Sequence, residues 1–538
     1  MKRFTYAFAW VILHLTVTFV VPLRADEAPK PDHGKVPGTI VAYSPAASGI
    51  YIGSPGIVIL PDGTYLAKHD EFGPKSAEGT NAITHVYRSA DRGQSWKHIA
   101  RVEDAFWVNI FHHQGAVYMM GSSAGHRHGR CIIRKSTDGG RTWTEAKDEN
   151  TGLLFPNLSY HTAPMPMVIH NGRIWRAMED EQGGDRWGQW FRAFVMSAQV
   201  DADLLQASSW TASDRLARDA SWLDGRFNGW LEGNAVLTPD GRMVDILRVA
   251  GVPEKAAVIQ ISEDGKTAAF DPETGFVDFP GGSHKFTIRY DAESKAYWSL
   301  SNPNIGGSVR NTLALLRSED LVNWETRCIL LYHPDTRHHG FQYPDWVIDG
   351  DDMIAAIRTA YDDGVGGAHN FHDANYLTFH RFKNFRNLTL ADSVVQPDHI
   401  GPGGPAKLDL GAATVEGRGF ALGTLGNGQL AFGNRNYVWE QVPETLSGWR
   451  FTQTLGGVPA RMRVTAKRDT VLHMATATSQ SAMDTSGWEP RPEFGFRYTD
   501  GGRTTMQVFR RAIKAGESLD IPQGNWTGGV LLAPPGNE

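Results

Sequence analysis

The chain has 538 residues, of which 41% are hydrophobic and 11% aromatic, and it contains 58 glycines. This length allows about two or more domains with a large core, and the composition is typical of a turn-rich, all-β protein. The formal charge of −6 lacks the basic excess of nucleic-acid binders, so no nucleic-acid partner is expected.

The N-terminus has the features of a secretory signal. Lys2 and Arg3 precede an apolar run from residue 4 to residue 23. We expect residues 1–25 to be a signal peptide, the mature protein to be secreted or periplasmic, and no membrane contact after signal removal. An uncleaved membrane anchor stays open as an alternative, because Leu23 is not the small residue that a cleavage site prefers.

Cysteine usage argues against a disulfide scaffold. Only Cys131 and Cys328 occur, and the repeats described next place them far apart. We therefore predict two free, buried thiols.

Six segments repeat one pattern of apolar strand, polar turn and second apolar strand. Their spacings of 51, 56, 69, 53 and 58 residues suit four-stranded blades with loops of variable length. The pattern predicts six blades around one axis, with the segment near residues 39–43 joining the last blade to close the ring. The six hairpins are residues 56–70, 107–122, 163–180, 232–249, 285–303 and 343–361.

The hairpins sort the polar residues onto two faces. In an antiparallel hairpin, the start of the first strand and the end of the second lie at one edge, and the turn lies at the other. The edge away from the turns is therefore the expected ligand face. It gathers His69, Asp70, Trp107, His161, Asp180, Glu232, Arg248, Lys285, Asn302, Tyr343 and Tyr361.

Two copies of the pattern S-x-D-x-G-x-[ST]-W lie 47 residues apart, at residues 89–96 and 136–143, with degenerate versions at 262–265 and 318–324. In such a turn the Asp accepts backbone N–H bonds, the Gly supplies a positive φ and the Trp packs between sheets. The pattern resembles the Asp-box, or BNR repeat, of the sialidase-type β-propeller.

Over roughly residues 45–390 the chain resembles the sialidase superfamily of six-bladed exo-α-glycosidases. Residues 232–248 look like the strand that carries the family's site Glu and second Arg, here Glu232 and Arg248. Residues 301–310 look like the segment of its third Arg, here Arg310, and residues 340–346 are similar to the segment of its Tyr nucleophile, here Tyr343.

The resemblance implies a coherent chemistry. A neutral phenol is a poor nucleophile, so Tyr343 needs a nearby carboxylate such as Glu232 to accept its proton. Arg248 and Arg310 can hold a substrate carboxylate. We expect His69 or Asp70 to donate the proton, and the further predicted substrate-binding residues are Lys285, His161, Tyr361 and His372.

Two departures set this chain apart from the family. Residues 53–56 replace the family's Arg-Ile-Pro, so its first Arg is missing and we expect only two guanidinium groups in the site. The loop at residues 68–78 offers no unambiguous equivalent of the family's acid/base Asp. Poor release of simple sialic acid is therefore expected, with activity on another acidic or modified sugar.

Three functions remain open on these residues. The first is a secreted exo-glycoside hydrolase, and the second is a β-propeller polysaccharide lyase in which Tyr343 or a His abstracts the proton α to a uronate carboxylate. The third is a non-catalytic, glycan-binding propeller. We expect a monomer with an oligosaccharide or polysaccharide substrate and with no cofactor or metal, although the H-x-x-H at residues 369–372 leaves a metal site as an alternative.

The repeat pattern ends at a Gly/Pro-rich linker, residues 397–405. We expect the propeller to span residues 36–395 and a small β-sandwich to span residues 406–538. The second domain either packs against the propeller or binds carbohydrate through exposed tryptophans, for which the candidates are Trp439, Trp449 and Trp488.

Overall fold

The computed structural model describes residues 30–252, 254–303, 309–395, 405–433, 435, 437–457, 459–478 and 483–535. The predicted signal peptide and the predicted linker up to residue 404 lie outside these ranges. Within them, no helix has the length and apolar character needed to cross a membrane.

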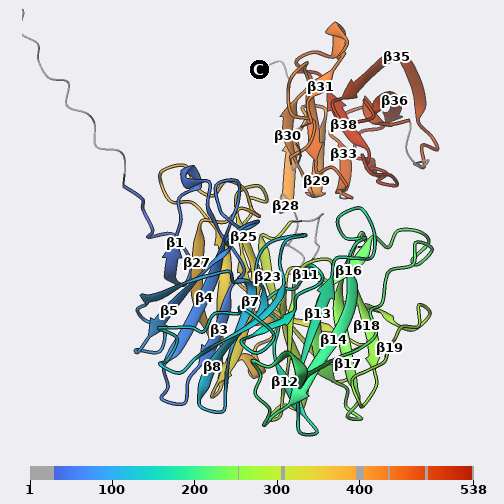
Figure 1. The fold of residues 1–538 in the computed structure, drawn as a ribbon. Helices are drawn as coiled ribbons and strands as arrows, with labels where there is room; N and C mark the ends of the chain where they lie inside the picture. The colour runs from blue at the N-terminus through green and yellow to red at the C-terminus, as the bar shows by residue number, and fades with distance from the viewer. Residues whose placement is uncertain are drawn as a thin grey trace, which may run out of the picture.

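The part of the chain before residue 396 forms six sheets of four or five strands, so the all-β prediction is confirmed (Figure 1). Each predicted hairpin lies in one of these sheets, which we call blades 1 to 6.

Blade 1 holds β2 (Tyr51–Ile52), β3 (Gly56–Ile59), β4 (Tyr65–Phe72), β5 (Ile83–Ser89) and β6 (Lys97–Glu103). Blade 2 holds β7 (Phe106–His113), β8 (Ala116–Ser122), β9 (Cys131–Ser136) and β10 (Leu153–Phe155). Blade 3 holds β11 (Tyr160–His161), β12 (Val168–His170), β13 (Arg173–Asp180), β14 (Arg192–Gln199) and β15 (Trp210–Ala212). Blade 4 holds β16 (Gly229–Leu237), β17 (Met243–Ala250), β18 (Lys255–Ile261), β19 (Ala268–Ala269) and β20 (Phe276–Asp278). Blade 5 holds β21 (Thr287–Asp291), β22 (Ala296–Ser301), β23 (Thr312–Ser318) and β24 (Glu325–Tyr332). Blade 6 holds β25 (Gly340–Asp349), β26 (Asp352–Ala360), β27 (Tyr376–Phe382) and β1 (Thr39–Tyr43).

The N-terminal strand closes the ring, as predicted. β1 pairs antiparallel with β27 in blade 6, with Thr39 opposite Phe379 and Tyr43 opposite Tyr376. The first strands of neighbouring blades contact one another, β25 with β3 and β3 with β7. This pairing covers the outer edge of β27, and exposed sheet edges favour aggregation.

The two Asp-boxes have the hydrogen bonds expected of them. Asp138 Oδ1 accepts the backbone N–H groups of Arg141 and Thr142 at 3.0 Å each, and its Oδ2 accepts the Thr142 hydroxyl at 2.7 Å. Asp91 binds Ser95 in the same way, and Gly93 has a φ of 91°. These turns hold blades 1 and 2 at the edge away from the ligand face.

Both cysteines are free and buried, which confirms the prediction made from the sequence. Cys131 lies on β9 in blade 2 and Cys328 lies on β24 in blade 5.

Three first strands from alternate blades carry a β-bulge near the ligand face. The pairing shifts between Phe106 and Asn109 on β7, between Leu231 and Asn234 on β16, and between Gln342 and Asp345 on β25. Inside each bulge one non-glycine residue has a left-handed backbone: Trp107 (φ 51°), Glu232 (φ 60°) and Tyr343 (φ 52°). A bulge re-aims a side chain, here toward the mouth of the channel.

The chain after residue 404 forms two further sheets. One holds β28 (Pro405–Asp409), β29 (Ala413–Arg418), β33 (Arg461–Ala466) and β37 (Ser518–Asp520). The other holds β30 (Phe420–Thr424), β32 (Arg450–Thr454), β38 (Val530–Ala533), β34 (Thr470–Ala477), β36 (Thr505–Ile513), β35 (Glu489–Tyr498) and β31 (Trp439–Glu440). One hydrophobic core draws on both sheets, for example through Val464 and Met474, so the two sheets pack against each other.

Two of the three candidate tryptophans of this C-terminal part are buried, contrary to the exposed platform that the sequence suggested. Trp439 is 1% exposed and Trp488 is 7% exposed, because both side chains fill the cores between the strands. Trp449 is half-buried. The expectation of exposed Trp439 and Trp488 was therefore wrong.

Replacing Asp138 by Ala should lower the free energy of unfolding by about 1 kcal/mol, because the turn loses its acceptor while remaining partly exposed to water. Hydrogen bonds from Thr142, Ser136 and Arg141 hold the pKa of Asp138 at about 2. A depressed carboxyl pKa stabilises the fold above the unfolded pKa, so this contribution should disappear as the pH falls from about 4 toward 2. Urea unfolding at several pH values measures both effects. The exposed Asp201, changed to Ala, is the control and should leave stability unchanged.

Candidate active site

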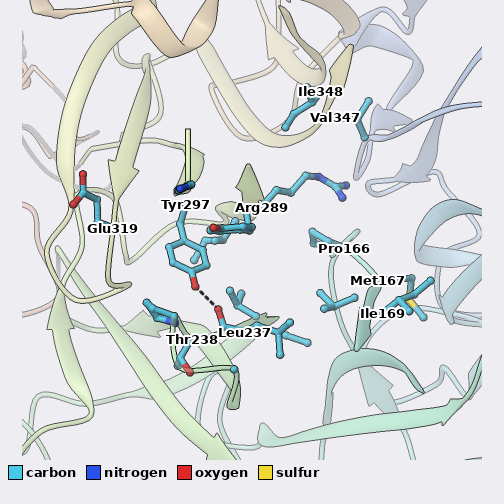
Figure 2. Close-up of a pocket in the computed structure, with 18 residues that line it drawn as sticks. Pro166, Met167, Ile169, Leu237, Thr238, Arg289, Tyr297, Glu319, Val347 and Ile348 are labelled. Carbon is cyan, nitrogen blue, oxygen red and sulfur yellow. Dashed lines mark hydrogen bonds between the residues drawn. The ribbon is translucent and has the colours of Figure 1, made fainter. Parts of the chain in front are cut away.

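Two hollows lie at opposite ends of the channel. The one at the turn end has a volume of about 610 Å³ and is lined largely by apolar side chains, including Met167, Ile169 and Ile348 (Figure 2). Figure 2 shows Tyr297 pointing at Leu237, whose carbonyl oxygen accepts its hydroxyl at 2.6 Å. No residue predicted to carry chemistry lines this hollow, so it is not the candidate site.

The hollow on the ligand face has a volume of about 390 Å³ and receives side chains from all six blades. We call it the axial cavity. It combines acidic, basic, imidazole and aromatic groups, which is the mixture expected of a catalytic site. Its lining residues are Gly53, Ser54, Phe72, Glu78, Phe106, Trp107, His126, His161, Trp187, Leu231, Glu232, Arg248, Arg310, Tyr343, Arg358 and His372.

Glu232 and Tyr343 meet inside the axial cavity. The Tyr343 hydroxyl donates to Glu232 Oε1 at 3.0 Å, and Arg248 Nη1 donates to Glu232 Oε2 at 2.9 Å. Burial by itself would raise the pKa of Glu232, but the positive charge of Arg248, with His161 and Arg310, holds it below its usual value. Glu232 is therefore ionised at neutral pH and can accept the phenol proton.

Two guanidinium groups lie over the tyrosine ring. The Arg310 carbon Cζ is 5.2 Å from the centre of the Tyr343 ring, and that of Arg358 is 5.0 Å from it. Arg358 also lies 4.2 Å from the centre of the Phe72 ring, and its Nε donates to the His372 carbonyl at 3.1 Å. Burial lowers the pKa of Arg358 to about 10, so this group stays charged at neutral pH.

Arg358 corrects the prediction of only two guanidinium groups. Three arginines line the cavity, and the third comes from blade 6 rather than from the start of blade 1. The register shows a signal that could have found it. Arg358 pairs with Gln342, the residue before Tyr343, just as Arg248 pairs with Leu231, the residue before Glu232.

Two histidines, each bonded to a buried carboxylate, form another wall. His126 Nδ1 lies 2.7 Å from Glu181 Oε1, and His161 Nδ1 lies 3.0 Å from Glu179 Oε2. The two imidazole rings are stacked with centres 5.2 Å apart, and Trp107 contacts both. Burial lowers the pKa of His126, so this imidazole is neutral at neutral pH.

Glu78 is the acidic residue that the loop at residues 68–78 contributes to the cavity. Its Oε2 accepts the Gly73 N–H at 3.2 Å and lies 3.4 Å from the Ser76 hydroxyl. Burial raises the pKa of Glu78, and these hydrogen bonds offset the rise only in part. A carboxyl group with a raised pKa is suited to donate a proton.

His69 and Asp70 do not line the cavity, although both were expected to. Strand β4 runs on to Phe72, so the cavity edge lies beyond them. The His69 ring packs inside blade 1 and bonds the Tyr87 hydroxyl at 3.1 Å. Asp70 is fully buried and bonds Lys68 Nζ and Thr84 Oγ1, each at 2.8 Å.

Lys285 and Tyr361 were also placed wrongly. Lys285 Nζ is buried below the cavity and donates to the Pro344 carbonyl at 2.5 Å. Tyr361 packs against His333 and His339 outside the cavity. His161 and His372 do line it, as expected, and burial together with Arg358 lowers the pKa of His372 to about 4.

Trp187 stands at the rim of the cavity and was missed in the sequence because it lies in a long loop of blade 3. It is 44% exposed, and the Arg248 guanidinium lies 5.9 Å from its ring centre. Among the described residues, no three His, Cys, Asp or Glu side chains are arranged to hold a metal ion.

Comparison with known proteins agrees with this architecture. Residues 112–355 match the BNR repeat-like domain. This match and the hydrogen bonds of the two Asp-boxes agree with the resemblance to sialidase-type BNR-repeat propellers. No curated protein sequence matches the chain.

Solved structures resemble the chain at low identity. A protein of unknown function from Dyadobacter fermentans is 14% identical, with a TM-score of 0.45 over 64% of this chain and 98% of that one. An α-L-arabinanase of Penicillium chrysogenum is 15% identical, with a TM-score of 0.41 over 65% of this chain and 98% of that one. A sialidase of Trypanosoma rangeli is 13% identical, with a TM-score of 0.42 over 90% of this chain and 83% of that one.

Replacing Arg358 by Met should weaken the binding of an acidic monosaccharide by roughly tenfold to a hundredfold, because one charge-assisted contact is lost. Calorimetric titration with N-acetylneuraminate and glucuronate measures the loss, with neutral glucose as the reference ligand. Arg327→Met, which removes a guanidinium group from outer strand β24, should bind like the wild type. Equal binding by Arg358→Met and the wild type would exclude Arg358 from anion recognition.

Proposed function

We propose that the protein is a secreted glycoside hydrolase that removes an acidic sugar from the end of a glycan, with Tyr343 as nucleophile and Glu232 as its base. The observation that carries the proposal is the 3.0 Å hydrogen bond from the Tyr343 hydroxyl to a carboxylate that Arg248 keeps ionised. This contact provides the route by which a phenol can lose its proton as it attacks.

The charge of the axial cavity supports an anionic substrate. Arg248, Arg310 and Arg358 carry three positive charges, and Arg248 is neutralised by Glu232. Arg310 and Arg358 both lie over the Tyr343 ring, so a carboxylate bound to them would bring the sugar close to the phenol. A phenol approaches such a substrate with less electrostatic repulsion than a carboxylate nucleophile would.

The mechanism follows from these positions. The Tyr343 oxygen attacks the anomeric carbon while its proton passes to Glu232, and the bond to the leaving oxygen breaks. Glu78 gives its proton to that oxygen, which departs as an alcohol. Water then attacks the glycosyl-tyrosine, with Glu78 as base, and the phenol recovers its proton from Glu232.

The paired histidines favour a second candidate, a polysaccharide lyase. His126 is neutral and lies in the cavity, so it can accept the proton α to a uronate carboxylate. Elimination leaves a 4,5-unsaturated uronate that absorbs in the ultraviolet, whereas hydrolysis gives no unsaturated product. A panel of sialylated and uronate-containing oligosaccharides, read by mass and absorbance, separates the two reactions. Binding without any product would favour the third reading, a non-catalytic glycan-binding propeller.

Changing Tyr343 to Phe should lower kcat on the best substrate of this panel by about a thousandfold or more, because only the reacting hydroxyl is removed. The melting temperature should change little. Tyr361→Phe is the matched control, since that tyrosine lies outside the cavity, and it should retain wild-type turnover. Wild-type turnover by Tyr343→Phe would remove Tyr343 from the mechanism.

Changing Glu78 to Gln should lower kcat/KM by about 10²–10⁴-fold on substrates whose leaving group needs a proton. The loss should be much smaller on a nitrophenyl glycoside, whose leaving group departs as a stable anion. Because the acid form of Glu78 is the active one, wild-type kcat/KM should fall as the pH rises through its raised pKa, and the variant should lack this fall.

Glu71→Gln tests whether this effect is specific to the cavity. Glu71 lies nearby on β4, pairs with His85 at 2.8 Å and does not line the cavity. The Glu71→Gln variant should keep the wild-type dependence of kcat/KM on pH. A Glu78 variant with an unchanged profile would exclude Glu78 as the acid.

A further inference from the structure

The bulges that carry Trp107, Glu232 and Tyr343 are held by side chains from the preceding blade. Left-handed backbone costs free energy in a residue with a Cβ, so it persists only where neighbouring groups impose it. In blade 2 the Trp107 N–H donates to Asp70 Oδ2 at 2.8 Å. In blade 4 the Gly233 N–H, next to Glu232, donates to Glu179 Oε1 at 3.0 Å.

The third bulge has a different partner, and its next residue is a proline. Pro344 has no N–H for a carboxylate to accept, so only its carbonyl is available. Lys285 Nζ and Thr287 Oγ1, both from blade 5, donate to that carbonyl at 2.5 and 2.7 Å. A cationic or hydroxyl donor thus replaces the carboxylate acceptor of the other two bulges.

Lys285 and Thr287 also bind each other. Lys285 Nζ donates to Thr287 Oγ1 at 2.5 Å, and the Thr287 hydroxyl donates in turn to the Pro344 carbonyl. Lys285 is 1% exposed and Thr287 is fully buried, so water does not compete with these bonds. The three groups form a closed triangle at Pro344, the residue that follows Tyr343.

The charges around Lys285 fit a role in structure rather than in substrate binding. Burial lowers its pKa to about 7; Asp345 and Glu232 oppose the shift, and Arg289 and Lys68 add to it. An uncharged amine still has two N–H groups, enough for Thr287 Oγ1 and the Pro344 carbonyl. Lys285 can therefore make both hydrogen bonds whether its amine is charged or neutral.

We propose that Lys285 and Thr287 are positioning residues that hold the Tyr343–Pro344 peptide, so that the phenol meets Glu232 beneath the arginines. The proposal rests on the proposed role of Tyr343 for its effect on turnover. Its geometric part, the contact between the Tyr343 hydroxyl and Glu232, stands independently of any substrate.

The test compares Lys285→Met, Thr287→Val and Thr287→Ser in the full chain. Thr287→Val keeps the shape and removes the hydroxyl, so it remains informative if Lys285→Met fails to fold. Thr287→Ser restores the hydroxyl and should rescue every effect of the valine variant. Thr359→Val is the matched control, because Thr359 is buried in blade 6 and bonds Thr378 rather than Pro344.

Crystal structures of the variants give the readout that needs no substrate. In Lys285→Met and Thr287→Val, the Tyr343 hydroxyl should move beyond hydrogen-bond distance of Glu232, whereas Thr287→Ser and Thr359→Val should keep the 3.0 Å contact. If the Tyr343 hydroxyl stays within hydrogen-bond distance of Glu232 in both Lys285→Met and Thr287→Val, the proposal is overturned, whatever the enzyme activity.

Kinetics on the best substrate of the oligosaccharide panel gives the second readout. Misplacing a reacting group by about 1 Å can cost a hundredfold in rate, so kcat should fall by roughly tenfold to a hundredfold in Thr287→Val. KM should change little, because the arginines still bind the anion. A loss of activity in the control equal to that in Thr287→Val would overturn the proposal. If no oligosaccharide of the panel gives a product, that result counts against the proposed function alone. The crystal structures still test whether Lys285 and Thr287 maintain the contact between the Tyr343 hydroxyl and Glu232.

Discussion

The site depends on keeping one carboxylate ionised in a place that water barely reaches. Glu232 is 2% exposed, and removing a charge from water is expensive unless opposite charge and hydrogen bonds replace the solvent. Arg248 provides that replacement on one carboxylate oxygen, which leaves the other for the tyrosine hydroxyl. The arrangement links anion binding, base strength and nucleophile orientation through a single side chain.

The same site requires backbone strain at the mouth of the channel. A regular strand points successive side chains to the two faces of its sheet, which face the neighbouring blades, rather than toward a ligand at the channel mouth. The bulges in blades 2, 4 and 6 turn Trp107, Glu232 and Tyr343 into the axial cavity at the cost of a left-handed residue in each. Because the hairpins are closed and well packed below, the fold can bear this local cost.

Charged side chains are also paired inside the propeller. Lys68 and Asp70 form a fully buried pair at 2.8 Å, and Arg289 pairs with Asp345 at 3.2 Å lower in the ring. Such pairs add little net stability, since desolvation offsets their attraction. Their value here is directional: Asp70 and Asp345 also accept backbone N–H groups from neighbouring blades and so fix how the blades meet.

Local sequence determined much of this protein, because turns, strand alternation and Asp-boxes are short-range properties. The hairpins, the closing strand and the free cysteines could be predicted on that basis. The meeting of Glu232, Arg248, Arg310 and Tyr343 was expected from the resemblance to the sialidase superfamily. Tertiary structure decided which strand-end residues reach the cavity. His69, Asp70 and Lys285 lie near the right edge but point into blades or at backbone, since strand length and bulges shift the cavity by one or two residues. Arg358 and Glu78 enter it through cross-strand register and a loop path, which depend on pairing between segments and cannot be read from either segment alone.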